Sequence, residues 1–388
     1  MKEQEIKWIT GLKGFCCITV VLLHLLACLF VPAQNAAYKY LPITGMYNFI
    51  QLTPVNIFFN GSFSVYIFWT ISAFLLTRSY NLNPSAKMLA RKNLAKFFRV
   101  MAPVAVVSII AFALLQCGLY YHIQAGELLD YSFWISERDY TGFDIRKLIF
   151  ELLWTDWMGE SSLIPPLWTI RYEFIGCILV SMLLATGVGK NKKIFILLSI
   201  LLFGGNLRVY ICFIAGMYLA NIYETTPRSK KGIIYFIIGI VIGAYPPTGI
   251  PVAGMYRWIY DEILTRLNAL VNRNLGVHVI YILGAFLILL GIIKCDGLKK
   301  VFSFKVFHYL GTISMYIYIC HIPVIWSVAA YTFYRVYAGG NNIFVSAAVC
   351  AGVGIWVTIA CAVVLKKVDV TFIGPKVGSL MDKILESF

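Results

Sequence analysis

The chain has 388 residues, of which 60% are hydrophobic and only 13% are charged, and its formal net charge is +15. A soluble chain of this length carries charge on about a quarter of its residues, so the composition excludes a soluble protein. It predicts an all-α integral membrane protein with one transmembrane domain over residues 1–388. We expect no cleaved signal peptide, because MKEQEIKWITGLKG leads into a long apolar run without a small-residue cleavage site.

Apolar runs divide the chain into predicted membrane spans. A helix that crosses a bilayer needs about 20 mostly apolar residues. Ten runs come near this length, although the fifth and the sixth are short, so about ten transmembrane helices are expected. In chain order the runs lie at 14–31, 57–77, 99–118, 166–186, 194–206, 209–223, 233–249, 276–293, 306–334 and 343–365.

The distribution of lysine and arginine predicts the orientation. With the N-terminus in the cytoplasm, nine of the 33 Lys and Arg residues fall outside, Arg171 falls inside a span, and 23 fall at cytoplasmic ends. This excess predicts cytoplasmic N- and C-termini for a multi-pass protein of the plasma or inner membrane. The basic charge therefore reflects topology and indicates no nucleic-acid partner, although it leaves room for an anionic cytosolic ligand. The cytoplasmic clusters are KNKK at 190–193, RSKK at 228–231, LKK at 298–300 and KK at 366–367.

Three segments outside the spans have features of their own. Residues 85–99, SAKMLARKNLAKFFR, form a basic amphipathic stretch expected on the cytoplasmic side. Residues 119–165 are expected outside and hold three tryptophans, and residues 256–275 have the spacing of an interfacial helix. The ten cysteines show no CxxC pair and no metal-ligand spacing, so neither a metal site nor a disulfide is expected.

The first span carries two ionisable residues, Lys13 and His24, within TGLKGFCCITVVLLHLLACLF. Their spacing corresponds to about three helical turns, so both side chains lie on one face and about 16 Å apart along the axis. Lys13 then lies at the cytoplasmic boundary, where it could serve simply as an interfacial anchor. His24 lies near the bilayer midplane with only leucine neighbours. Ionisable groups at that depth usually face a cavity or a partner and mark a functional site.

Other polar residues are predicted at similar depth. Glu173 follows Arg171 in PPLWTIRYEFIGC, and it could pair with that arginine or orient a catalytic imidazole. Pro323 is expected to bend the ninth span and to widen a cavity there. The further candidates are Ser72, Ser314, Tyr318 and His321.

Five short stretches, in order and over most of the chain, resemble motifs of the acyltransferase-3 family of ten-helix membrane acyltransferases. Lys13 and His24 match the first, a basic residue followed by ten residues and a histidine. Together the five stretches are far more specific than any one of them. The other four are YIFWTISAFLL (66–76), which resembles D-x-F-F-x-x-S-G-F-L; KFFR (96–99), which resembles R-x-x-R; LWTIRYE (167–173), which resembles L-W-[ST]-L-x-x-E; and LGTISMYIYICH (310–321), which resembles L-G-x-x-S-Y-x-x-Y-L-x-H.

Three positions depart from the family pattern. Tyr66 stands where the family usually has an acidic residue, and Ala73 replaces a glycine. Lys96 replaces an arginine, which keeps the charge but loses bidentate phosphate binding. The extracellular hydrolase domain that often follows in this family is absent from the sequence, so we expect a stand-alone membrane enzyme.

The resemblance implies an O-acyltransferase that uses cytosolic acyl-CoA, expected to be acetyl-CoA, as its donor substrate and holds no bound cofactor. It implies that Lys13, Lys96 and Arg99 bind the donor phosphates. His24 is the implied general base, with Glu173 orienting it. The implied acceptor is a hydroxyl of a cell-surface carbohydrate or glycolipid, as in polysaccharide modification, and the chain is surrounded by membrane lipid. The channel or oxyanion candidates are Ser72, Arg171, Ser314, Tyr318 and His321.

A second class, a proton-coupled secondary transporter or exporter, also fits ten helices with a midplane histidine and buried Glu and Arg residues. The sequence shows no internal repeat, and the five ordered motifs favour the acyltransferase. Consumption of acyl-CoA by the purified protein separates the enzyme from a protein that only performs gradient-driven uptake.

Overall fold

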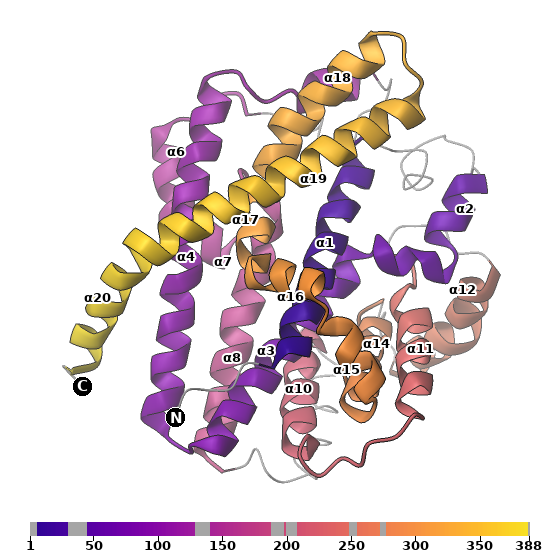
Figure 1. Cartoon of the computed structure of the whole chain (residues 1–388), viewed down its shortest axis with the longest axis vertical. Coiled ribbons are helices and arrows are strands. Elements are labelled where there is room, and N and C mark those ends of the chain that lie inside the picture. Colours follow the sequence, from indigo (N-terminus) through magenta and orange to yellow (C-terminus); the bar gives the residue numbers. More distant parts are fainter. Residues whose placement is uncertain are drawn as a thin grey trace. The chain divides into compact units, whose positions relative to one another are not determined.

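The computed structural model describes residues 6–29, 45–128, 140–187, 198, 208–247, 254–271 and 277–386. In these ranges every regular element is a helix and none is a strand, which confirms the all-α class (Figure 1). The chain divides into two compact units. The first comprises residues 1–19, 39–93 and 172–312, and the second comprises residues 20–38, 94–171 and 313–388. Three of the boundaries fall within long helices, α1 (Lys7–Leu29), α4 (Ala86–Gln116) and α8 (Trp168–Ala185).

Several helices have the length and composition of membrane spans. Five of those described qualify, and a sixth is obtained if α14 (His278–Lys294) and α15 (Asp296–Phe302) form one span with a 106° bend. Two further apolar helices, α10 (Ile211–Ile222) and α11 (Gly232–Gly243), are shorter. The membrane class is thus supported, whereas the count of ten is not confirmed. Apart from residue 198, the predicted span 194–206 lies outside the described residues. The five qualifying segments are Lys7–Leu29, Ala86–Gln116, Pro165–Ala185, Ser314–Ala338 and Ile343–Ser379.

Two predicted boundaries differ from the structure. The helix of the predicted span 99–118 begins earlier, because α4 starts at Ala86 and includes nearly all of the basic stretch 85–99. With 31 residues, α4 is about 47 Å long, which exceeds the hydrocarbon thickness of about 30 Å, so its basic turns can lie beyond the core. The predicted span 306–334 is interrupted at Ile313, between α16 (Lys305–Thr312) and α17 (Ser314–Val324). A π-helical turn, Ile325–Ala329, follows Pro323 and leads into α18 (Ala330–Ala338).

The first unit is built around α3 (Gly61–Leu82), α10, α11 and α14. Its core contains large buried aromatic side chains from these helices, among them Trp69, Phe74, Phe213 and Tyr281. The smaller elements of this unit are α2 (Gly45–Gln51), 3-10 turns at Pro54–Phe58 and Arg208–Tyr210, α12 (Gly254–Trp258), a π-helical turn at Ile259–Leu264 and α13 (Thr265–Val271).

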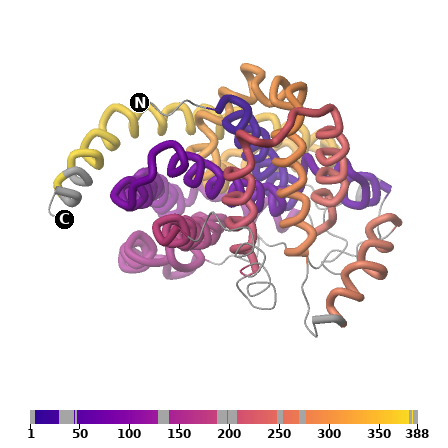
Figure 2. The backbone as a smooth tube through the Cα atoms, turned by 90° about the horizontal axis from the view of Figure 1, so that it is seen from below, coloured from indigo at the N-terminus to yellow at the C-terminus, as the bar shows by residue number. Residues whose placement is uncertain are grey.

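Glycine lets α11 and α14 pack backbone against backbone. A Cβ atom added to Gly291 would lie 2.7 Å from the carbonyl oxygen of Gly232, and one added to Gly232 would lie 2.6 Å from the carbonyl oxygen of Gly291. Any side chain at either position would force the helices apart, and such small-residue contacts are typical of helix pairs in membranes. Figure 1 and Figure 2 show the two helices side by side. This contact fixes the positions of Arg228, shortly before α11, and Asp296, directly after α14.

Close packing also explains the glycine of the fifth motif. A Cβ atom at Gly311 would fall on the carbonyl group of Thr10 in α1, and one at Gly11 would fall on the carbonyl group of Phe302. The N-terminal half of α1 therefore contacts α16 and the end of α15 through main-chain atoms. Side chains at these glycines would remove that contact.

The second unit contains the C-terminal half of α1, most of α4, α17 and α19 (Ile343–Val368). Figure 1 shows α19 crossing α17. A Cβ atom on Gly354 of α19 would lie 3.1 Å from Ala329 Cβ and 3.2 Å from Leu25 Cδ2, so α1 and α19 contact each other beside His24. The other elements are α5 (His122–Glu127), α6 (Ile145–Phe150), a π-helical turn at Glu151–Thr155, α7 (Asp156–Met158), a 3-10 turn at Pro165–Leu167, a π-helical turn at Asp369–Ile373 and α20 (Gly374–Glu386).

Candidate functional site

His24 lies in an uninterrupted part of α1. The helix runs from Lys7 to Leu29, so the predicted register holds, with Lys13 and His24 on one face and about 16 Å apart along the axis. The Nδ1 atom of His24 lies 2.8 Å from the carbonyl oxygen of Val20, one turn earlier. His24 is half-buried as a residue.

The second histidine of the candidate set, His321 on α17, contacts His24 directly. Its Nε2 atom lies 3.3 Å from Nδ1 of His24, and the two ring centroids are 4.9 Å apart. Its own Nδ1 lies 2.7 Å from the carbonyl oxygen of Tyr318. His321 is 0% exposed, in contrast to His24. Residues 297 positions apart therefore form one imidazole pair within the second unit.

The hydrogen bonds of this pair favour one arrangement of protons. A carbonyl oxygen only accepts, so Nδ1 of His321 carries its hydrogen and Nε2 has the lone pair. Likewise Nδ1 of His24 carries its hydrogen, which it directs at the Val20 carbonyl and shares with Nε2 of His321. The lone pair of His24 is then on Nε2. We assign the tautomers from these contacts, and they leave His24 with a basic nitrogen on the side away from His321.

Tyr318 connects two of the five motifs. Its hydroxyl donates to the carbonyl oxygen of Pro166 at 2.8 Å and lies 2.8 Å from the hydroxyl of Thr169, the third residue of LWTIRYE. Its ring centroid is 5.7 Å from that of His321. Because the Tyr318 hydrogen is directed at Pro166, this residue anchors α17 to the start of α8. Thr169 was not singled out from the sequence, although it occupies the Ser/Thr position of the motif.

The other candidates of the second unit have separate places. Nη1 of Arg171 donates to the carbonyl oxygen of Met158 at 3.1 Å. Ser314 is buried at the first residue of α17. On α4, Lys96 is half-buried and Arg99 is exposed. The structure thus places His24, Tyr318 and His321 in one cluster, whereas the roles predicted for the other residues stay predictions.

Lys13, Ser72 and Glu173 belong to the first unit, and all three are half-buried. Their predicted roles in donor binding, channel formation and orientation of the imidazole also stay predictions. The first unit shows instead what replaces the acidic residue of the second motif. The hydroxyl of Tyr66 is hydrogen-bonded to Nδ1 of His278, at the start of α14. A tyrosine thus meets an imidazole where the family usually has a carboxylate.

Glu151 and Asp156 form a cluster of buried carboxylates. The sequence did not reveal it, because segment 119–165 was predicted to lie outside the membrane spans. Glu151 accepts from the hydroxyl of Ser161 at 2.9 Å and from the N–H of Ser162 at 2.6 Å. Asp156 accepts from the hydroxyl of Ser108 at 2.8 Å. Burial raises the pKa of Asp156 to about 6; hydrogen bonds from Ser161 and Ser108 lower it and the charge of Glu151 raises it. These bonds hold the chain that leads into the Pro166 turn.

Comparison with known proteins gives one match. Residues 6–365 match the family model described as an acyltransferase domain, the domain of the acyltransferase-3 family. No curated protein and no solved structure matches the chain. The matched range includes the histidine pair and all five motifs.

Proposed function

Because the chain belongs to the acyltransferase-3 family of membrane acyltransferases, we propose that it transfers an acyl group from cytosolic acyl-CoA to a hydroxyl outside the cytoplasm. We propose acetyl-CoA as the donor and a cell-surface carbohydrate or glycolipid as the acceptor. The proposal includes about ten spans, cytoplasmic termini and a place in the plasma or inner membrane, as the 23-to-9 division of Lys and Arg favours.

The observation that carries the proposal is the contact between His24 and His321. Acyl transfer to a hydroxyl needs a base near neutral pH, and imidazole is the usual one. The tautomers assigned above leave Nε2 of His24 with a lone pair. The contact with Nε2 of His321 holds the ring of His24 and opposes its rotation. His321 therefore acts in the proposal as a positioning residue, in the manner of the group that orients a catalytic histidine in hydrolases.

The proposed reaction proceeds in two steps. Nε2 of His24 removes the proton from the acceptor hydroxyl, and the oxygen attacks the thioester carbonyl carbon. The resulting tetrahedral oxyanion collapses, the C–S bond breaks, and the CoA thiolate takes the proton back from the imidazolium. The imidazolium keeps its Nδ1 hydrogen between the Val20 carbonyl and His321, and both groups stabilise its positive charge. Glu173 is a second candidate for orienting the ring, and Ser72, Arg171 and Ser314 are candidates for the channel.

The function is tested with the purified full-length protein in detergent. We expect release of the free CoA thiol from acetyl-CoA when acceptor carbohydrates are supplied, and the acetyl group should appear on the acceptor. Mass spectrometry of the acceptor and a thiol assay measure the two products. Gradient-driven uptake into proteoliposomes without any CoA release would identify a transporter and overturn the proposal.

We expect the donor to bind through its phosphates to the basic residues Lys13, Lys96 and Arg99. Lys13→Ala or Arg99→Ala should weaken acetyl-CoA binding by about 1.5–3 kcal/mol, the scale of a hydrogen bond to a charged group. The loss should shrink as salt rises, because these groups lie near water. Titration calorimetry at low and high salt measures both effects.

The matched control is Arg335→Ala, which removes a cation on the side predicted to be outside and should leave donor binding unchanged. Unchanged affinity in both Lys13→Ala and Arg99→Ala at low salt would refute the assignment.

A further inference from the structure

Tyr223, directly after α10, lies close to three cationic side chains from three segments of the first unit. The Cζ atom of Arg78 on α3 lies 5.6 Å from the centroid of its ring, Cζ of Arg228 lies 5.5 Å away, and Nζ of Lys299 on α15 lies 5.8 Å away. The face of an aromatic ring attracts cations, so Tyr223 holds the three groups together. Two of them come from the basic stretches RSKK and LKK.

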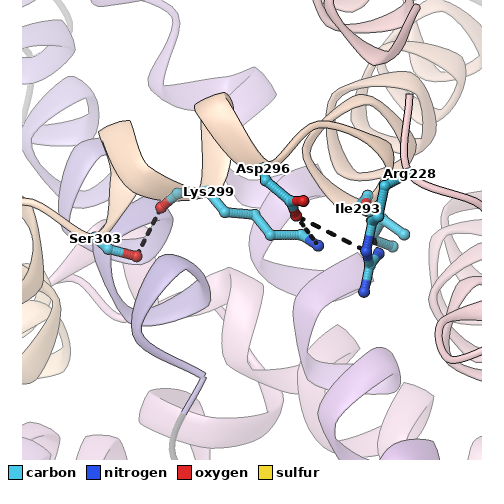
Figure 3. Close-up of polar contacts among 5 residues, drawn as sticks. All are labelled: Arg228, Ile293, Asp296, Lys299 and Ser303. Carbon is cyan, nitrogen blue, oxygen red and sulfur yellow. Dashed lines mark hydrogen bonds and ion pairs between the residues drawn. The ribbon is translucent and has the colours of Figure 1, made fainter. Parts of the chain in front are cut away.

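The carboxylates nearby do not enclose these cations. Figure 3 shows Asp296 between two of them, with Oδ1 3.1 Å from Nζ of Lys299 and 3.8 Å from Nε of Arg228. Glu224 lies 3.7 Å from Nη2 of Arg78. The side chains of Asp296 and Glu224 are 63% and 71% exposed, so these pairs are well solvated and weak. Two carboxylates against three cations leave the group positively charged.

Arg78 has the donor that these contacts do not satisfy. Its side chain is 17% exposed, and its Nε–H is buried without a hydrogen-bond acceptor among the described residues. Arg228, in contrast, directs Nη1 at the carbonyl oxygen of Ile293 at 2.5 Å (Figure 3). A guanidinium presents its N–H groups as a planar fork that fits two oxygens of one phosphate. One buried and unsatisfied N–H of a guanidinium, beside two more cations, suits the binding of a phosphate oxygen.

We propose that Arg78, Arg228 and Lys299 bind a phosphate group of a phosphorylated ligand around Tyr223. The oxygens of the phosphate accept from Nε of Arg78 and from the other two cations, and Glu224 turns to solvent. Two sources share this chemistry. One is the headgroup of an anionic phospholipid, since the site lies where α3, α10 and α14 end. The other is a soluble phosphate compound, for which inorganic pyrophosphate is the probe. The site is independent of the histidine pair, and the proposal does not depend on acyl transfer.

The test uses full-length protein and two probes. Phosphatidylglycerol retained by the protein in native mass spectrometry measures headgroup binding, with phosphatidylcholine as the zwitterionic competitor, whose phosphate is offset by a choline cation. Titration calorimetry with inorganic pyrophosphate measures binding of a soluble phosphate. In Arg78→Gln and in Lys299→Gln we expect at least one probe to bind about tenfold more weakly or to be lost, the effect of one hydrogen bond to a charged group. Loss of phosphatidylglycerol identifies the headgroup, and loss of pyrophosphate identifies a soluble ligand.

The matched control is Arg266→Gln. Arg266 is also paired with a carboxylate, that of Glu262, but its side chain is 75% exposed and it lies on α13 of the same unit. Its substitution should leave both probes unaffected. Lys299→Gln keeps the test valid if Arg78→Gln fails to fold, which a melting curve reveals. If folded variants bind both probes as the parent does, the proposal is wrong. Failure of catalysis in His24 variants has no bearing on these readouts.

Discussion

His24→Gln should abolish acyl transfer while the protein stays folded. Glutamine is polar and nearly as large as histidine, but its amide has no basic nitrogen that could take the acceptor proton. Loss of a general base lowers kcat by about 10²–10⁴-fold. Binding of the donor should be unchanged, because its phosphates are proposed to bind at Lys13, Lys96 and Arg99 and not at His24. Initial rates of thiol release and titration calorimetry measure the two quantities separately.

The control for this experiment is His308→Gln, the same replacement at a half-buried histidine of α16 in the first unit. It should retain the parent rate. Substantial acyl transfer by His24→Gln would mean that His24 serves helix packing, and that the base is another group, with His321 the first to be examined. A lower melting temperature of His24→Gln with an unchanged rate of acyl transfer would likewise mean that His24 serves helix packing.

His321→Leu should lower kcat by about 10–100-fold and leave the KM for the donor nearly unchanged. Leucine fills the buried site but cannot accept the Nδ1 hydrogen of His24, so the imidazolium loses one hydrogen bond. A hydrogen bond to a charged group contributes about 1.5–3 kcal/mol, which corresponds to this range of rates. His321→Gln should recover part of the rate, because its carbonyl oxygen can accept.

This pair of variants separates positioning from packing. If His321 only fills space, leucine should be tolerated at least as well as glutamine, and kcat should follow the melting temperature. Recovery by glutamine at equal or lower stability can arise only from the hydrogen bond. Equal kcat in the parent and in His321→Leu would refute the positioning role. Single-turnover rates with saturating acetyl-CoA measure the effect without a contribution from product release.

Features that depend on neighbours along the chain were predictable. Apolar content predicted a helical membrane protein, since a backbone in lipid must satisfy its own hydrogen bonds. The register of Lys13 and His24 followed from the helical period alone, and α1 confirms it. The five motifs predicted the family, and the match over 6–365 shows it. Element boundaries were less accurate, because the apolar run at 306–334 gives no sign of the break at Ile313.

Features that depend on distant residues needed the tertiary structure. The sequence named His24, His321 and Tyr318 but could not show that the two imidazoles touch or that Tyr318 binds the start of α8. It proposed Glu173 to orient His24, and the structure adds a contact between His24 and His321, because helix packing sets which side chains meet across 297 residues. Local patterns reveal charge and periodicity, whereas the partners of a buried polar group are decided only when helices pack. For the same reason the stretches RSKK and LKK predicted only the orientation in the membrane. The grouping of Arg228 and Lys299 around Tyr223 was visible only in the fold.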